Sequence, residues 1–109
     1  MNIIDELTEV LEARRSAAPE SSYVASLYEN GLNKILEKVG EEATEVIIAG
    51  KEAVGNGRQE ALLHEVADLW FHTCVLLVHL EQKPRWVLEV LEARFGTSGH
   101  TERANREEL

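Results

Sequence analysis

Residues 32–54 read LNKILEKVGEEATEVIIAGKEAV, and together with residues 61–80, ALLHEVADLWFHTCVLLVHL, they decide the fold. In the first stretch apolar residues recur every three or four positions, which is typical of one face of an α-helix. The second stretch is apolar nearly all round, as expected of a helix buried at the centre of a bundle. Because Gly55-Asn56-Gly57 separates them, we expect two long helices joined by a tight turn. The apolar stripe of the first comprises Leu32, Ile35, Leu36, Val39, Ala43, Val46 and Ile47.

Shorter helical segments flank this pair, and no segment shows the alternation of a β-strand. A chain of 109 residues fits one domain, so we expect a single all-α domain over residues 1–109, a helical bundle. Ser22 is expected to cap the second helix, and Pro84 to open the last one. The predicted helices are 2–15, 23–29, 32–54, 58–82 and 84–95, with loops at 16–22 and 96–99 and a frayed helix in the charged tail.

The charge of the chain argues against a nucleic-acid partner. It has 11 basic and 20 acidic side chains, a formal net charge of −9, and no basic stripe. A small phosphorylated ligand remains compatible, because a divalent cation can bridge carboxylates to phosphates. Cys74 is the lone cysteine, which excludes an intramolecular disulfide and fits a reducing compartment. Since the start of the chain also lacks the pattern of a signal peptide, we expect a cytoplasmic protein.

Residues 61–80 are long enough to suggest a transmembrane helix. They contain Glu65, Asp68 and three histidines, however, which are costly inside a bilayer. A buried central helix explains this composition better, so we expect no membrane association. Because so short a chain has little else to cover such a helix, we expect a second copy to complete the core in a homodimer.

Three glutamates on the first long helix share one stripe. At about 100° per residue, Glu41, Glu42 and Glu45 align with Lys34 and Lys38, and Glu42 borders the apolar face. Like charges this close repel one another. The stripe is either a solvated acidic face, partly neutralised by Lys38, or part of a cation-binding site.

Glu65 and Asp68 on the second long helix favour the cation-binding site. They lie among apolar residues, and residues 59–82 contain no lysine or arginine to pair with them. A carboxylate buried without a cation takes up a proton or binds a metal, whereas one that faces water needs neither. If Asn56 marks the turn of a hairpin, Glu45 lies 11 residues before it and the other two lie 9 and 12 after it. The carboxylates then meet in an oxygen-only site suited to Mg²⁺, with Mn²⁺ as a substitute.

A di-iron bundle is the main rival site. It uses Glu-x-x-His on two helices, but here Asp68 stands where that pattern requires histidine. His72, four residues further on, could ligate or support a metal. The alternative is a core histidine whose hydrogen bonds are satisfied within the protein.

The acidic positions match a known motif. Glu41-Glu42-Ala43-Thr44-Glu45, followed after 19 residues by Glu65-Val66-Ala67-Asp68, resembles the E-E-x-x-E…E-x-x-D pattern of the all-α nucleoside triphosphate pyrophosphohydrolases, the MazG-like group. The surrounding residues 31–42, GLNKILEKVGEE, are similar to the phosphoribosyl-ATP pyrophosphohydrolase family, as are Ser22-Tyr23 and residues 94–106. The resemblance covers essentially the whole chain.

This resemblance implies a homodimeric, Mg²⁺-dependent hydrolase of histidine biosynthesis, which binds phosphoribosyl-ATP and yields phosphoribosyl-AMP and pyrophosphate. Catalysis is then expected from Glu41, Glu42 and Glu45, with Glu41 supporting the ligands or orienting the attacking water. The implied metal ligands are Glu42, Glu45, Glu65 and Asp68.

Substrate contacts are expected from residues near this motif. Lys34 and Lys38 are candidates for phosphate contacts, although salt bridges to Glu41 and Glu42 explain them equally well. Ser22 and Tyr23 are candidates for lining the nucleotide pocket, although a helix cap and a packed aromatic ring are also sufficient explanations.

Two other functions remain open at this point. One is a house-cleaning pyrophosphohydrolase of canonical or damaged dNTPs, which the carboxylates alone cannot distinguish. The other is a non-catalytic helical dimer that serves as an interaction module and binds no magnesium.

Overall fold

The computed structural model describes residues 2–55 and 57–95, and within these ranges every α-helix expected from the sequence is present and no strand occurs. The all-α prediction is therefore confirmed. The predicted loop at 96–99 and the frayed tail lie outside the described residues. The elements are α1 (Ile3–Arg14), a 3₁₀ turn η1 (Pro19–Ser21), α2 (Tyr23–Asn30), α3 (Leu32–Ala53), α4 (Gln59–His79) and α5 (Pro84–Ala93).

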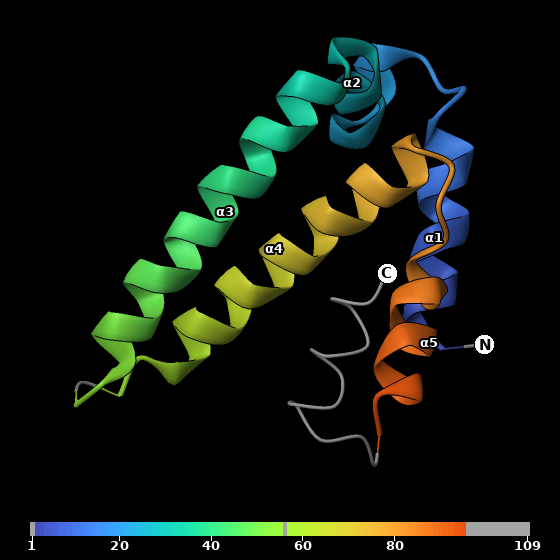
Figure 1. Cartoon of the computed structure of the whole chain (residues 1–109). Coiled ribbons are helices and arrows are strands. Elements are labelled where there is room, and N and C mark those ends of the chain that lie inside the picture. Colours follow the sequence, from blue (N-terminus) through green and yellow to red (C-terminus); the bar gives the residue numbers. More distant parts are fainter. Residues whose placement is uncertain (1, 56, 96–109) are drawn as a thin grey trace.

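The two long helices form an antiparallel hairpin, with α3 and α4 side by side along most of their length (Figure 1). Gly55 and Gly57 take φ angles of 81° and 73° at the turn, a region that favours glycine because it has no Cβ. α4 ends at His79, three residues earlier than predicted. Glu81 takes a φ of 62°, and Gln82 N donates to Leu77 O at 2.8 Å, which closes the last turn of the helix.

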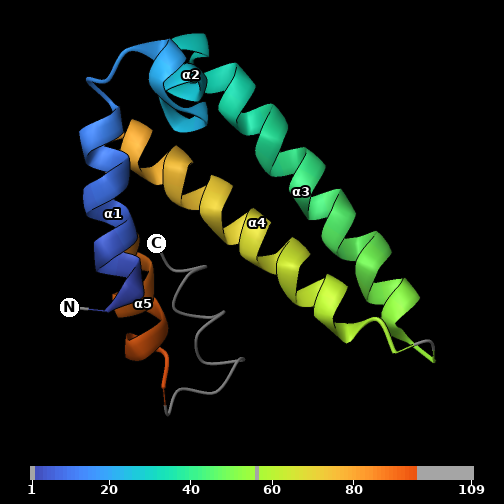
Figure 2. The same ribbon diagram turned by 180° about the vertical axis from the view of Figure 1, so that it is seen from behind.

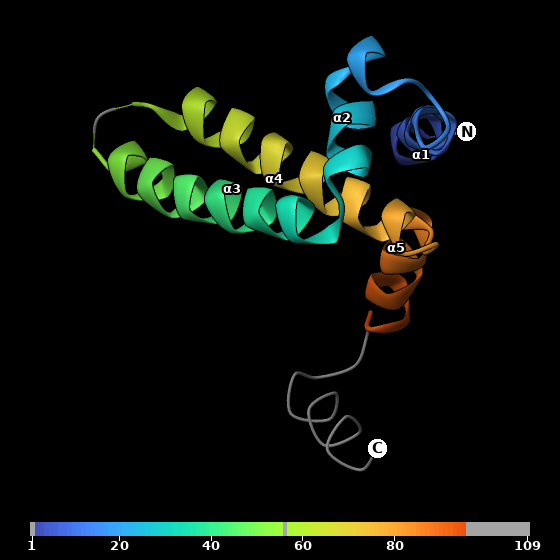
Figure 3. The same cartoon turned by 90° about the horizontal axis from the view of Figure 1, so that it is seen from above.

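The hydrophobic core lies at one end of the hairpin. There α1 packs against the last turns of α4, α2 packs against the first turns of α3, and α5 lies beside α1 (Figures 1 and 2). Seen from above, the rest of the hairpin projects away from this core (Figure 3). Its middle therefore lies outside the core. The buried core residues are Leu11, Val24, Leu27, Ile35, Cys74, Val75 and Val78.

α4 is less covered in one chain than a buried central helix would be. Leu63 is 68% exposed and Trp70 is 63% exposed. On α3 the predicted apolar stripe is buried at Ile35, whereas Ile47 is 72% exposed. By length and composition alone α4 could cross a membrane, and 22% of its most apolar stretch is buried within the chain. This helix also carries Glu65 and Asp68.

Candidate metal centre

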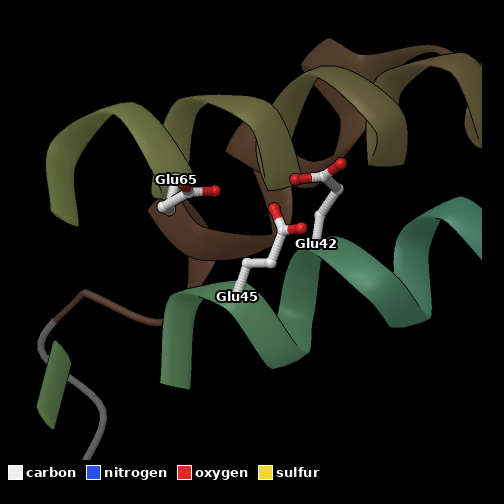
Figure 4. A group of neighbouring side chains, drawn as sticks. All are labelled: Glu42, Glu45 and Glu65. Carbon is white, nitrogen blue, oxygen red and sulfur yellow. The ribbon is translucent and has the colours of Figure 1, made fainter. Parts of the chain in front are cut away.

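Three glutamates meet between the two long helices. Glu42 and Glu45 are three residues apart on α3, so both side chains point from one face of that helix toward α4. Glu65 on α4 points toward them from the opposite side (Figure 4). One carboxylate oxygen from each of the three lies within 4.8 Å of the others. We call these three residues the glutamate trio.

Two oxygens of the glutamate trio are buried without a partner. Glu42 is 7% exposed, and its Oε2 and the Oε2 of Glu65 have no hydrogen-bond partner among the described residues. A buried carboxylate oxygen in this state is costly unless a cation or a proton satisfies it. The trio therefore fits a hard divalent cation, which prefers carboxylate oxygens as ligands.

The electrostatics of the trio agree with its geometry. Burial raises the pKa of Glu42, and the hydrogen bond and negative charge of Glu45 raise it further. The hydrogen bond to Glu45 raises the pKa of Glu65, and burial adds to this effect. Both shifts arise because several carboxylates share a poorly solvated space. A bound divalent cation would reverse them by favouring the charged forms.

Asp68 lies beside the glutamate trio but not within it. Its side chain is exposed on α4, one turn after Glu65, and its oxygens are not among those that converge. Its negative charge nevertheless contributes to the raised pKa of Glu42 and of Glu65. Asp68 therefore acts on the trio from its solvent side.

Lys38 holds Glu41 at the edge of the site. Its Nζ donates to Glu41 Oε2 at 2.8 Å and lies 3.9 Å from Glu42 Oε1. This hydrogen bond and the positive charge of Lys38 lower the pKa of Glu41, so Glu41 stays ionised beside carboxyls whose pKa is raised. Lys34 lies one turn earlier and pairs at 3.5 Å with Glu37 instead. Of the two lysines, only Lys38 has an ion pair with a member of the trio.

Ser22 and Tyr23 occupy the start of α2. Ser22 Oγ accepts from Ala25 N at 3.0 Å, so the predicted helix cap is confirmed. The Tyr23 hydroxyl lies 2.8 Å from His72 Nε2, which joins α2 to α4. His72 is 6% exposed, and its Nδ1 lies 2.9 Å from the Asp68 carbonyl oxygen.

His72 is therefore a core histidine with both ring nitrogens engaged, as one of the two sequence interpretations had it. Its bond to Tyr23 was missed. The two residues are 49 positions apart, and nothing in the helical pattern connects them. The only sequence signal was the position of His72 one turn beyond Asp68, on the side of α4 that carries the carboxylates.

The sequence of the chain matches a known protein family. The model of one family, described as phosphoribosyl-ATP pyrophosphohydrolase, matches residues 4–95 of the chain. The matched range includes all five helices almost completely, both acidic motifs and the Tyr23–His72 pair. It favours an enzyme over the non-catalytic interaction module.

Proposed function

The chain belongs to the phosphoribosyl-ATP pyrophosphohydrolase family, and on this premise we propose that it hydrolyses its substrate in a Mg²⁺-dependent reaction centred on the glutamate trio. The family makes it a hydrolase of phosphorus-containing anhydrides in histidine biosynthesis, acting on a phosphorylated nucleotide. The observation that supports the magnesium site is the convergence of Glu42, Glu45 and Glu65 with two unpartnered buried oxygens.

In this proposal Glu42, Glu45 and Glu65 hold the cation, and Asp68 completes the set from the solvent side. Once bound, Mg²⁺ supplies positive charge to the phosphate oxygens and lowers the pKa of water. Glu41 is ionised and held by Lys38, so it can orient the attacking water through a hydrogen bond.

A glutamate of the motif also accepts the proton of that water. We assign this general-base role to the cluster formed by Glu41, Glu42 and Glu45. Lys38 borders the trio and offers a positive charge to the departing pyrophosphate. Lys34, one turn before Lys38 on α3, can contact the outer phosphates.

We further propose that a second copy of the chain covers the exposed apolar face. Leu63, Trp70 and Leu77 recur at seven-residue intervals along α4, the spacing of a helix–helix seam. Trp70 and Leu77 also line an apolar groove of about 360 Å³ that α1 and α5 complete. Burial of this face against a twofold copy removes more apolar surface from water than a monomer can. We therefore expect a homodimer in the cytoplasm, with no membrane or nucleic-acid partner.

Pyrophosphate release from phosphoribosyl-ATP tests the proposal. Wild-type protein should release pyrophosphate with Mg²⁺, should accept Mn²⁺ as a substitute better than other divalent ions, and should be inactive in EDTA. The nucleotides dUTP and dCTP should be poor substrates. Glu42→Gln and Glu65→Gln should lower kcat at least about a hundredfold while helical circular dichroism is retained. Glu52→Gln, exposed on the same helix as Glu42, is the matched control and should be active. Wild-type rates in EDTA, or in either trio variant, would contradict the proposal.

A further inference from the structure

The Tyr23–His72 hydrogen bond has a defined direction. The Asp68 carbonyl oxygen that His72 Nδ1 contacts can only accept, so Nδ1 must carry a hydrogen. In the neutral ring Nε2 then has a lone pair and no hydrogen. With the ring neutral, the bond of 2.8 Å between Nε2 and the Tyr23 hydroxyl is therefore made by the proton of Tyr23.

This direction decides what Tyr23 offers to a ligand. A phenol has one proton, and here it is committed to a buried imidazole. Tyr23 itself is 51% exposed, so a ligand can reach its ring and oxygen. What the oxygen presents to that ligand is a lone pair. It can accept a hydrogen bond but has no proton left to donate.

The pair lies next to the proposed reaction site. His72 follows Glu65 by two turns on α4, and Tyr23 lies on α2, which packs against the end of α3 that carries Lys38. His72 is also bonded to the backbone of Asp68, one turn after Glu65 on α4. A nucleotide whose phosphates reach the trio therefore brings its organic part within range of Tyr23.

We propose that Tyr23 recognises a hydroxyl or amino hydrogen of the nucleotide, and not its phosphate oxygens, and that His72 is the positioning residue that orients it. Phosphate oxygens are acceptors and would face the lone pair of Tyr23 unfavourably, whereas ribose hydroxyls and the adenine amino group are donors. This role rests on the proposed function for the identity of the nucleotide. The direction of the Tyr23–His72 bond does not.

The direction can be measured without any activity. ¹⁵N NMR of the His72 ring at pH about 8.5, well above the ordinary histidine pKa of about 6.5, distinguishes the two neutral tautomers. We expect a pyrrole-like Nδ1 and a pyridine-like Nε2. A protonated Nε2 would overturn the proposal, since Tyr23 would then accept from His72 and keep its own proton for a phosphate.

Ligand binding tests the recognition itself. Dissociation constants of pyrophosphate, ribose 5-phosphate and AMP with Mg²⁺ are measured by calorimetry for wild type and Tyr23→Phe. We expect Tyr23→Phe to weaken the binding of at least one organic ligand about two- to tenfold and to leave the binding of pyrophosphate unchanged. A loss for ribose 5-phosphate identifies a hydroxyl donor, and a loss for AMP alone identifies the nucleoside part. No loss for either, or an equal loss for pyrophosphate, would overturn the proposal.

The role of His72 is tested by two variants of different reach. His72→Asn keeps a donor near the Asp68 carbonyl but is too short to reach Tyr23. It should therefore lower the affinity for the same ligand as Tyr23→Phe does. The double variant should bind that ligand no more weakly than either single variant. His72→Gln offers an acceptor at the distance of Nε2 and should restore part of the affinity. Additive losses, or no rescue by glutamine, would mean that His72 only packs α4. If wild type binds these ligands but does not hydrolyse phosphoribosyl-ATP, the proposed function fails and the role of Tyr23 stands.

Discussion

A carboxylate oxygen of Glu45 on α3 lies within 4.8 Å of a carboxylate oxygen of Glu65 on α4, across the hairpin. In the absence of a cation, hydrogen bonding to Glu45 and burial raise the pKa of Glu65, because two ionised carboxylates this close repel each other. A divalent cation competes with the proton, because ligand carboxylates must be ionised to bind it. The proximity of the two side chains thus links the stability of the hairpin, its protonation and its affinity for metal.

The first prediction concerns the metal-free protein. Glu42 and Glu65 have raised pKa values in the fold, so the folded chain binds protons more tightly than the unfolded chain. Their favourable contribution is complete below the ordinary glutamate pKa of about 4.3 and is lost as pH rises through the raised values. Glu45→Gln removes one negative charge from the trio. In EDTA it should raise Tm by about 3 °C or more at pH about 7 and change it little at pH about 4.

Thermal unfolding at the two pH values measures this effect. The same Tm measurements are then repeated with Mg²⁺ in place of EDTA. Saturating Mg²⁺ should raise the Tm of the wild type at neutral pH and leave that of Glu45→Gln nearly unchanged. Glu52→Gln, exposed on the same helix, should behave like wild type throughout. Equal Mg²⁺ stabilisation of all three proteins would exclude the trio as the binding site.

A second prediction separates Asp68 from the trio. Asp68 is exposed, and its oxygens lie outside the converging group. Its loss should therefore weaken the binding of the cation more than it impairs turnover. Asp68→Asn should raise the Mg²⁺ concentration for half-maximal activity about tenfold, and high Mg²⁺ should restore most of kcat. Glu42→Gln should not be restored in this way. A Mg²⁺ titration of pyrophosphate release measures both, and full recovery of Glu42→Gln would make Glu42 dispensable.

The sequence was sufficient to predict the hairpin and the meeting of Glu42 and Glu45 with Glu65, although it included Asp68 with them. Helical spacing puts Glu42 and Glu45 on one face, and counting from Asn56 brings Glu65 to their height. Their convergence needs no information beyond the period of the helix and the position of the turn. The same counting did not separate Asp68 from the other three, because periodicity gives the direction of a side chain but not its reach.

Burial was harder to predict than helix position. The apolar pattern predicted a covered α4, yet Trp70 is 63% exposed in the single chain. A helical period reports which residues avoid water, not whether the cover comes from the same chain or from another. The Tyr23–His72 bond is equally remote from any local pattern, since it forms only when α2 and α4 meet in the folded core.

A third prediction compares the two lysines of α3. Lys38 bonds to Glu41 and lies 3.9 Å from Glu42, whereas Lys34 is exposed and pairs with Glu37. Lys38→Met should therefore lower kcat/KM for phosphoribosyl-ATP about tenfold or more. The variant lacks both the positive charge that stabilises the departing pyrophosphate and the hydrogen bond that holds Glu41. Lys34→Met should have a smaller effect, no more than about threefold, because the proposed contact of this exposed lysine with the outer phosphates is screened by solvent.

Steady-state kinetics at saturating Mg²⁺ provides the comparison, and Lys38→Arg is the matched control. Arginine keeps the charge but changes the geometry, so it should recover only part of the loss. Equal effects of the two methionine variants would contradict a special place for Lys38.

The last prediction concerns the apolar face of α4 and α5. Trp70 lines the groove together with Val87, Leu88 and Leu91 of α5, and all four are at least 40% exposed in one chain. Removing a tryptophan from a twofold interface acts in both copies, and a charge in its place must be buried. Trp70→Glu should therefore weaken dimerisation at least about a hundredfold, without loss of helix within the chain. Val10→Glu, exposed on α1 and outside the groove, should leave the dimer intact. Light scattering after size exclusion gives the mass of each variant. A monomeric wild type would leave the exposed Trp70 without the partner proposed for it, and a dimeric Trp70→Glu would place the interface on another face.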